Sequence, residues 1–254
     1  MRVTTWNVNS LRARMDHLAR FVEEAAPDVL CLQELKLDDD LFPADEIAAL
    51  GLPHQLWWGQ PTYNGVAILS RRPLEDPQRG FDGFDDDQAR VVAATVDGVR
   101  IYGLYTPNGQ AVGSDKFRYK LRWLDQLRTE LDRHDPRDDL LVCGDMNIAP
   151  DDLDVWDPFK ADGTVLCHPD ERGRFAGLID WGLTDSFREQ DPFSTAFTWW
   201  NYQKMGWQRN HGMRIDHVLL TRSLQARSTG VTIHREVRGW DQPSDHAPVS
   251  VDLS

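Results

Sequence analysis

Short apolar runs that end in a polar residue constrain the fold of this chain more than any other feature of its sequence. Several runs are rich in β-branched side chains, and short apolar runs of this kind are typical of buried strands. We expect strands at Arg2–Val8, Asp28–Leu32, Val66–Ser70, Val91–Val96, Val99–Tyr105, Leu140–Cys143, Ile215–Leu220 and Pro248–Leu253.

Two longer stretches carry apolar residues at helical spacing and lie between the predicted strands. They span Ser10–Ala26 and Lys116–Leu131, and each places its apolar side chains on one face. Ser10 is expected to cap the first helix, and Pro27 to end it. Strands interleaved with helices indicate an α/β or α+β sandwich.

The Asp97-Gly98 pair joins two of the predicted strands and is a strong signal for a tight hairpin. At least part of the sheet is therefore expected to be antiparallel. The 254 residues contain 41% hydrophobic and 27% charged residues, which is ordinary for a globular protein. One domain spanning residues 1–254 is the first expectation, because sandwiches of about 250 residues often fold as one unit, and two small domains are the second.

The chain has no apolar stretch near the roughly 20 residues of a membrane span, and its N-terminal residues lack the apolar core of a signal peptide. We therefore expect a cytoplasmic protein that does not bind membranes. Its three cysteines show no CxxC spacing. Reduced buried thiols are expected, and no disulfide framework or zinc site.

The net charge of −13 argues against a nucleic-acid partner, because phosphate binding favours basic surfaces. A few arginines and lysines gathered on one face could still bind DNA. Carboxylates that hold a metal would also add to the negative count.

The polar residues at the strand ends predict a site. Four early apolar runs are followed by polar groups, whereas two late runs are preceded by them. If the late strands run antiparallel to the early ones, all these groups meet at one sheet edge. That edge would carry Asn7, Glu34, Tyr105, Asn108, Asp145, Asn147, Asp216, Asp245 and His246.

Each of these residues has a plain structural explanation when taken alone, but a set of turns has no need of carboxylates, amides and an imidazole at matched strand ends. Gathered carboxylates repel one another, and a divalent cation would relieve that cost. Oxygen ligands suit Mg²⁺ or Mn²⁺ rather than zinc. The set therefore predicts metal-assisted phosphoryl transfer to water. No GxSxG, P-loop, HExxH or GxGxxG motif supports a competing chemistry.

The order of the motifs resembles exonuclease III-type AP endonucleases of the endonuclease/exonuclease/phosphatase superfamily. The resemblance runs from Arg2 to the C-terminus. Two segments, Leu183–Arg188 and Phe197–Tyr202, are similar to the DNA-repair branch. The superfamily motifs are Trp6–Ser10, Leu32–Glu34, Tyr63–Ala67, Tyr105 with Pro107–Gly109, Gly144–Pro150, Arg214–Asp216 and Ser244–Pro248.

This resemblance implies a four-layer α/β-sandwich, DNase I-like, in which two packed mixed sheets are flanked by helices. It also implies cleavage of the phosphodiester 5′ to an abasic site, with 3′→5′ exonuclease and 3′-end-cleaning activities. The implied partner is double-stranded DNA with an abasic site or a 3′ end. The implied cofactor is Mg²⁺, with Mn²⁺ as a further possibility, and a monomer is expected.

The resemblance also assigns roles to the strand-end residues. Glu34 would be the main metal ligand, with Asn7 and Asp245 completing or supporting the site. Asp145 would activate or orient the attacking water. The remaining catalytic residues would bind the phosphate or stabilise its charge: Tyr105, Asn108, Asn147, and His246 oriented by Asp216.

Apolar residues beside Asp216 are implied to hold the abasic sugar. These are Trp199, Met213 and Ile215. Adjacent strand residues face opposite sides, so only one of the two tryptophans at 199 and 200 is expected to line this pocket. Basic residues that could contact phosphates are Arg90, Lys116, Arg118, Lys204 and Arg209.

Two alternatives compete with the repair-nuclease hypothesis. One is a different phosphodiesterase of the superfamily, acting on RNA, a nucleotide or a lipid head group, which the acidic charge favours. The other is a catalytically silent DNA-binding or scaffold protein. That hypothesis is disfavoured because no member of the catalytic set is missing, whereas a silent protein would be free to lose Glu34 or His246.

Overall fold

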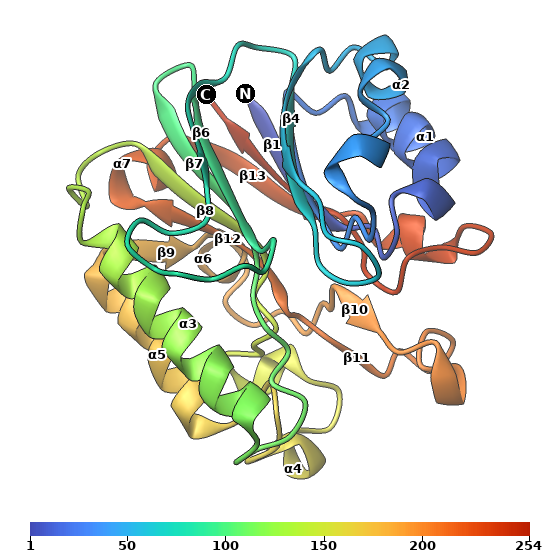
Figure 1. Ribbon diagram of the computed structural model, residues 1–254. Helices are drawn as coiled ribbons and strands as arrows, with labels where there is room; N and C mark the ends of the chain where they lie inside the picture. The colour runs from blue at the N-terminus through green and yellow to red at the C-terminus, as the bar shows by residue number, and fades with distance from the viewer.

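Two six-stranded sheets form the centre of the protein, as a computed structural model that describes residues 1–254 shows (Figure 1). The first sheet has the order β13-β14-β1-β2-β4-β3. Its strands are β1 (Arg2–Asn7), β2 (Val29–Gln33), β3 (His54–Trp58), β4 (Val66–Ser70), β13 (Ser228–Ile233) and β14 (Val249–Leu253).

The second sheet has the order β5-β6-β7-β8-β12-β9, and a separate two-stranded ribbon pairs β10 with β11. The strands of the second sheet are β5 (Glu75–Arg79), β6 (Val91–Val96), β7 (Val99–Tyr105), β8 (Leu140–Asp145), β9 (Leu183–Asp185) and β12 (Asp216–Thr221). The ribbon consists of β10 (Trp199–Trp200) and β11 (Gly212–Met213).

Helices cover the outer face of each sheet. The α-helices are α1 (Met15–Ala25), α2 (Ala44–Ala49), α3 (Asp115–Leu131), α4 (Pro158–Ala161), α5 (Pro169–Trp181), α6 (Ser186–Gln190) and α7 (Arg222–Gln225). Short 3₁₀ turns are η1 (Arg12–Arg14), η2 (Asp39–Leu41), η3 (Asp152–Asp154), η4 (Gln203–Met205) and η5 (Arg235–Gly239). None of the helices is long and apolar enough to span a bilayer.

Alternating side chains of the central strands explain the layers. In β2, Val29 and Cys31 belong to the core between the sheets, whereas Leu30 and Leu32 pack under α1. On the other side, side chains of α3 and α5 such as Trp123 pack on the outer face of the second sheet. The four-layer α/β-sandwich with two mixed sheets is thus confirmed.

Strand directions bring the polar strand ends together. Strand β1 runs parallel to β2, and β7 runs parallel to β8, whereas β14 and β12 run antiparallel to these pairs. The predicted inversion of the last two strands is therefore confirmed. The Asp97-Gly98 hairpin is confirmed as well, because Val96 pairs with Val99 in the β6–β7 ladder.

One predicted helix boundary is wrong. Ser10 does not cap the first helix, which begins only after η1 and has Arg14 at its cap position without a side-chain cap bond. The Ser10 backbone has a positive φ of 88°. Its N–H donates to the carbonyl of Glu34 at 2.8 Å, so the ladder between the ends of β1 and β2 determines its conformation.

Gly144 allows β7 and β8 to lie close together just before the end of β8. Its φ is 150°, and a Cβ atom there would lie 2.0 Å from the carbonyl oxygen of Leu104. A side chain at this position would push β8 away from β7 just before Asp145. Only glycine therefore permits this close approach of the two strands.

A buried ion network anchors the start of β12. Arg214 donates to Asp154 at 2.7 Å and to Asp185 at 2.8 Å, and Arg188 reaches Asp154 at 2.6 Å. Burial alone would raise the pKa of Asp185, but the charges of Arg214 and His217 outweigh it and hold that pKa well below its usual range.

We expect Asp185→Asn to lower the free energy of unfolding by about 3 kcal/mol at pH 7, because it leaves part of a buried charge unpaired. The folded-state pKa of Asp185 is depressed. Its contribution is therefore complete above the unfolded-state pKa of about 4 and is lost as the pH falls through the folded-state value. Urea unfolding at pH 7 and in strong acid checks this. A wild-type–variant difference that does not shrink in acid would contradict it.

Candidate active site

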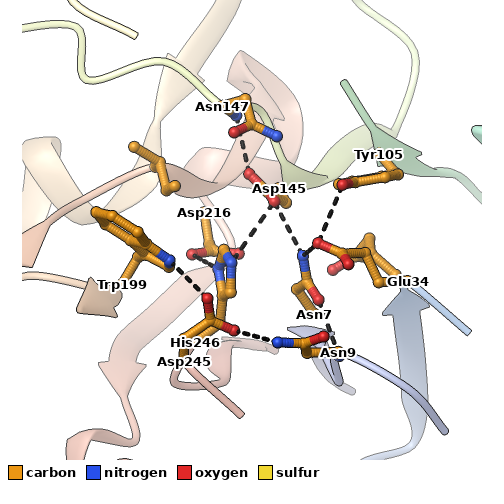
Figure 2. A network of polar contacts seen from close by, with 12 residues as sticks. Asn7, Asn9, Glu34, Tyr105, Asp145, Asn147, Trp199, Asp216, Asp245 and His246 are labelled. Atoms are coloured by element: carbon orange, nitrogen blue, oxygen red, sulfur yellow. Dashed lines mark hydrogen bonds and ion pairs between the residues drawn. The ribbon is translucent and has the colours of Figure 1, made fainter. Parts of the chain in front are cut away.

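Side chains from six strand ends converge at one edge of the two sheets (Figure 2). They come from β1, β2, β7, β8 and β12 and from the segment before β14. The group consists of Asn7, Glu34, Tyr105, Asn108, Asp145, Asn147, Asp216, Asp245 and His246, and a chain of hydrogen bonds and ion pairs connects them.

Asn7 lies at the centre of the group and bridges the two sheets. Its amide Nδ2 donates to Glu34 at 2.9 Å and to Asp145 at 3.0 Å. Its Oδ1 accepts from the backbone N–H of Asn9 at 3.0 Å. Asn7 therefore presents its amide nitrogen to the two carboxylates. Its role as a ligand stays a prediction.

Glu34 follows β2 directly and has a left-handed backbone, with φ 54°. Its carboxylate accepts from Tyr105 Oη at 3.0 Å and pairs with Lys36 Nζ at 2.8 Å. Burial alone would raise the pKa of Glu34, but the hydrogen bonds from Asn7 and Lys36 outweigh it, so the pKa is lowered. The group is therefore held ionised.

Tyr105 is supported from behind by Arg90. The guanidinium of Arg90 lies 4.9 Å from the centre of the Tyr105 ring and donates to the Tyr105 carbonyl at 3.1 Å. Burial, followed by the charge of Glu34, raises the pKa of Tyr105 well above its usual value. The phenol is thus a neutral donor. Arg90 is nearly buried, so it is better placed to support Tyr105 than to reach a phosphate by itself.

Asp145 ends β8 and is buried among charged groups. Its Oδ2 lies 3.8 Å from His246 Nε2, and its Oδ1 accepts from the backbone N–H of Asn147 at 2.9 Å. Burial raises the pKa of Asp145 to about 7, against the opposing effect of His246. A carboxyl with such a pKa can accept a proton near neutral pH.

Asn147 and Asn108 face each other across the same edge. Asn108 Nδ2 donates to Asn147 Oδ1 at 3.0 Å, and Asn147 Nδ2 donates to the Thr106 carbonyl at 3.0 Å. Asn147 has a positive φ of 49°. The two amides therefore form one polar surface beside Asp145.

His246 is oriented by Asp216. The two oxygens of Asp216 lie 2.9 and 3.1 Å from His246 Nδ1. Burial alone lowers the pKa of His246, but Asp216 and Asp145 outweigh it and raise the pKa to about 10. The imidazole therefore carries a positive charge at neutral pH. Asp216 is itself placed by Thr198, whose hydroxyl oxygen accepts from the Asp216 N–H at 3.1 Å.

Asp245 directly precedes His246 in the sequence and connects the centre to Trp199. Its carboxylate accepts from Trp199 Nε1 at 2.9 Å and from Asn9 Nδ2 at 2.8 Å. Burial alone would raise the pKa of Asp245, but the charge of His246 and the hydrogen bonds from Trp199 and Asn9 together outweigh it and lower the pKa. Both oxygens already accept hydrogen bonds, so Asp245 as a metal ligand also stays a prediction.

An apolar surface adjoins this polar centre. Ile215, Trp199 and Met213 belong to one cluster with Val155 and Leu166; Ile215 is buried, whereas Trp199 and Met213 are half-buried. Trp200 points the other way into a separate cluster with Phe197 and is fully buried. As expected from strand alternation, only Trp199 faces the site.

A polar cavity of about 410 Å³ opens on the side of the centre near Glu34 and Tyr105. Arg90 and Lys116 line it, together with side-chain amides and tyrosines. Arg118, by contrast, is paired with Asp115 on the surface. Of the predicted phosphate-binding residues, Arg90 and Lys116 thus border the site.

Two carboxylates, Glu34 and Asp145, offer oxygen atoms that could hold a metal ion beside the His246 ring. One ligand atom from each of Glu34, Asp145 and His246 lies within 4.8 Å of the others. The carboxylate oxygens are hard ligands that suit a divalent cation such as Mg²⁺. The donor set therefore fits a metal-dependent hydrolysis.

Sequence reasoning missed three residues that hold the site together. Asn9 connects Asn7 to Asp245, Lys36 neutralises Glu34, and Thr198 places Asp216. Asn9 and Lys36 each lie two residues beyond a predicted site residue, so continuing each motif past the strand end could have found them. Thr198 lies within the Phe197–Tyr202 motif, but its partners Ile215 and Asp216 come from another segment, so the motif by itself does not predict its role.

Comparisons with known proteins agree with this geometry. The model of the Endonuclease/Exonuclease/phosphatase family matches residues 4–246. Exodeoxyribonuclease III of Haemophilus influenzae is 34% identical, with 98% of each chain covered. A Neisseria meningitidis protein, solved as a 3′-5′ exonuclease, is 43% identical with a TM-score of 0.97 and all of both chains covered.

A further solved structure is an AP endonuclease from Archaeoglobus fulgidus. It is 33% identical, has a TM-score of 0.96 and covers 100% of this chain and 99% of its own. The family model covers almost the whole chain, and these relatives align over nearly their full lengths. The chain therefore belongs to the endonuclease/exonuclease/phosphatase family, in its exodeoxyribonuclease III-type branch of hydrolytic nucleases.

Proposed function

We propose that this protein is a Mg²⁺-dependent DNA repair nuclease. It cleaves the phosphodiester 5′ to an abasic site and also removes nucleotides and blocking groups from 3′ ends, as a single domain that acts as a monomer in the cytoplasm. The observation that carries this proposal is the convergence of Glu34, Asp145 and His246 within 4.8 Å at the edge of two sheets. Relatives named for exonuclease and AP endonuclease activity support it.

Asp145 is assigned to the attacking water. It is the buried carboxylate with the raised pKa of about 7, so it can orient a water molecule and take its proton. Asn147, whose N–H binds Asp145 at 2.9 Å, would hold the same water and a phosphate oxygen.

His246 is assigned to the charge that builds on the phosphate during attack. Its imidazolium, paired with Asp216 at 2.9 Å, is a fixed positive charge in a buried site. Such preorganised charge stabilises a transition state without reorganisation. Tyr105 and Asn108 would position the phosphate or assist the leaving oxygen, because both lie on the rim of the polar cavity.

Glu34 is assigned as the main metal ligand, with Asn7 and Asp245 supporting it. When bound, Mg²⁺ would supply Lewis-acid stabilisation of phosphate charge. Asn7 Nδ2, which contacts both Glu34 and Asp145, keeps these two carboxylates a fixed distance apart. The chain's own groups thus shape the donor set.

The apolar surface is assigned to the extruded abasic sugar. Trp199, Met213 and Ile215 lie next to Asp216 and Asp245, where a sugar without a base could enter beside the reacting phosphate. Flipping costs least where no base is stacked. The net charge of −13 means that the chain as a whole does not attract DNA, so lesion affinity would depend on this pocket.

The first prediction concerns the reaction itself. A duplex with one abasic analogue should be cut 5′ to the lesion in the presence of Mg²⁺, and a duplex with a recessed 3′ end should be shortened. EDTA should abolish both reactions, because the carboxylate site needs its cation. Gel analysis of end-labelled strands measures both. Cleavage of RNA or a nucleotide with both DNA substrates left intact would favour the alternative phosphodiesterase.

The second prediction concerns the catalytic groups. Glu34→Ala, Asp145→Asn and His246→Asn should each lower turnover on abasic DNA by about 100- to 10,000-fold. Asp97→Asn is the matched control, because it also removes one carboxylate but lies in the hairpin at the far end of β7. Circular dichroism checks folding. A variant that keeps the wild-type rate would refute the role given to its residue.

The third prediction separates the two substrates. Trp199→Ala should slow abasic-site cleavage more than removal of a 3′ nucleotide, because only the first places a bare sugar on the apolar surface. Trp199→Phe is the control: it keeps a ring but loses the Nε1 donor to Asp245. Steady-state rates on both substrates measure the effect. Equal losses of rate on both substrates would show that Trp199 only contributes to packing and does not contact the abasic sugar.

A further inference from the structure

A fully buried ion pair lies directly behind the loops that carry Asn108 and Asn147. Lys120 is on α3 and Glu171 is on α5, and the exposed fraction of each side chain is 0%. The two groups are in direct contact. A buried pair of this kind is costly to desolvate, and a pair of apolar residues is often as stable or more so. The pair therefore needs an explanation beyond stability.

The ammonium group of Lys120 binds the backbone of both site asparagines. It donates to the carbonyl of Asn147 at 2.6 Å and to the carbonyl of Asn108 at 3.2 Å. Glu171 takes its remaining donor. An ammonium has three N–H groups, so all are engaged and none is left for substrate. Lys120 acts on the site only through these two residues.

Asn147 is held by hydrogen bonds at both its backbone and its side chain. Its backbone is left-handed, with φ 49°, a conformation that asparagine adopts more readily than most non-glycine residues. Its side chain binds Asn108 and Thr106, and its N–H binds Asp145. A donor on its carbonyl therefore completes the set of bonds that fixes its orientation.

Glu171 secures the same region from the other side. Its carboxylate accepts from the N–H groups of Leu166 and His168, at 3.2 and 3.1 Å. The carbonyl of Leu166 in turn accepts from the N–H of Ala149 at 2.8 Å. The pair thus joins the loops after β7 and β8 to the segment before α5.

Connecting the two helices does not require this pair. Arg174 of α5 already pairs with Asp125 of α3 at 2.8 Å on the surface, and it donates to the Leu121 carbonyl at 3.1 Å. That contact joins the same helices without touching the site. It is the matched comparison for Lys120 and Glu171.

We propose that Lys120 is a positioning residue for phosphodiester cleavage, which holds the Asn108 and Asn147 amides at the reacting phosphate, and that Glu171 serves as its counter-ion. This inference rests on the proposed nuclease function. Loss of the Lys120 N–H donors is expected to lower kcat, whereas loss of one partner of the ion pair is expected to lower the free energy of unfolding. Variants can therefore separate the two effects.

Three variants separate these effects in cleavage of the abasic-analogue duplex. Lys120→Met should lower kcat by about 10- to 100-fold, as loss of supporting contacts typically does, with KM little changed. Glu171→Gln keeps the ammonium and should retain more of kcat while lowering the urea midpoint. Lys120→Met combined with Glu171→Gln leaves no buried charge, so its urea midpoint should exceed that of Lys120→Met, while its kcat stays low.

Two further measurements make the result decisive. Arg174→Gln should leave kcat unchanged. In an Asn147→Ala background, Lys120→Met should cause little further loss, because coupled residues are not additive. A wild-type kcat in the double variant, or an equal loss from Lys120→Met with and without Asn147, would overturn the inference. Failure of the wild-type protein to cleave any of the DNA substrates would instead overturn the proposed function.

Discussion

Four carboxylates around one imidazole, two of them buried and two half-buried, are the constraint on which the rest of this structure depends. Glu34, Asp145, Asp216 and Asp245 would repel one another, and each must be matched by a donor or a positive charge. His246 supplies the charge, and the Asn7 amide lies between Glu34 and Asp145. The positive charge and the amide donor offset part of the negative charge of the carboxylates. In the proposed reaction, the remaining carboxylate oxygens would bind a cation, and the cation would bind the phosphate.

The strand directions of the two sheets bring these charged groups to one edge. Parallel pairing of β1 with β2 and of β7 with β8 places four strand ends together, and the antiparallel strands β12 and β14 bring their beginnings to the same edge. Behind that edge, Gly144 allows close approach of β7 and β8, and the buried Lys120 fixes the loops beyond them. The contacts of Gly144 and Lys120 thus belong to the packing of the fold and also place the groups of the proposed catalytic site.

The eight strands predicted from the sequence are the eight interior strands of the two sheets, and the four missed from these sheets are their edges, β3, β5, β9 and β13. Interior strands are buried on both faces and read as apolar runs. An edge strand such as β5, Glu75–Arg79, is mostly exposed and contains Pro77, which an edge tolerates. Its sequence carries no apolar signal, and only pairing with β6 reveals it.

The sequence by itself determined which chemical groups stand at the ends of buried strands, because apolar alternation and its interruption are local properties of the chain. Family resemblance added their expected roles. Only the tertiary structure decided how these groups face one another: that Asn7 presents its nitrogen to the carboxylates, that Arg90 lies on Tyr105, and that Ser10 is held by Glu34 rather than capping a helix. Each of these contacts joins segments distant in sequence, so strand pairing and burial, which no local pattern encodes, determine them.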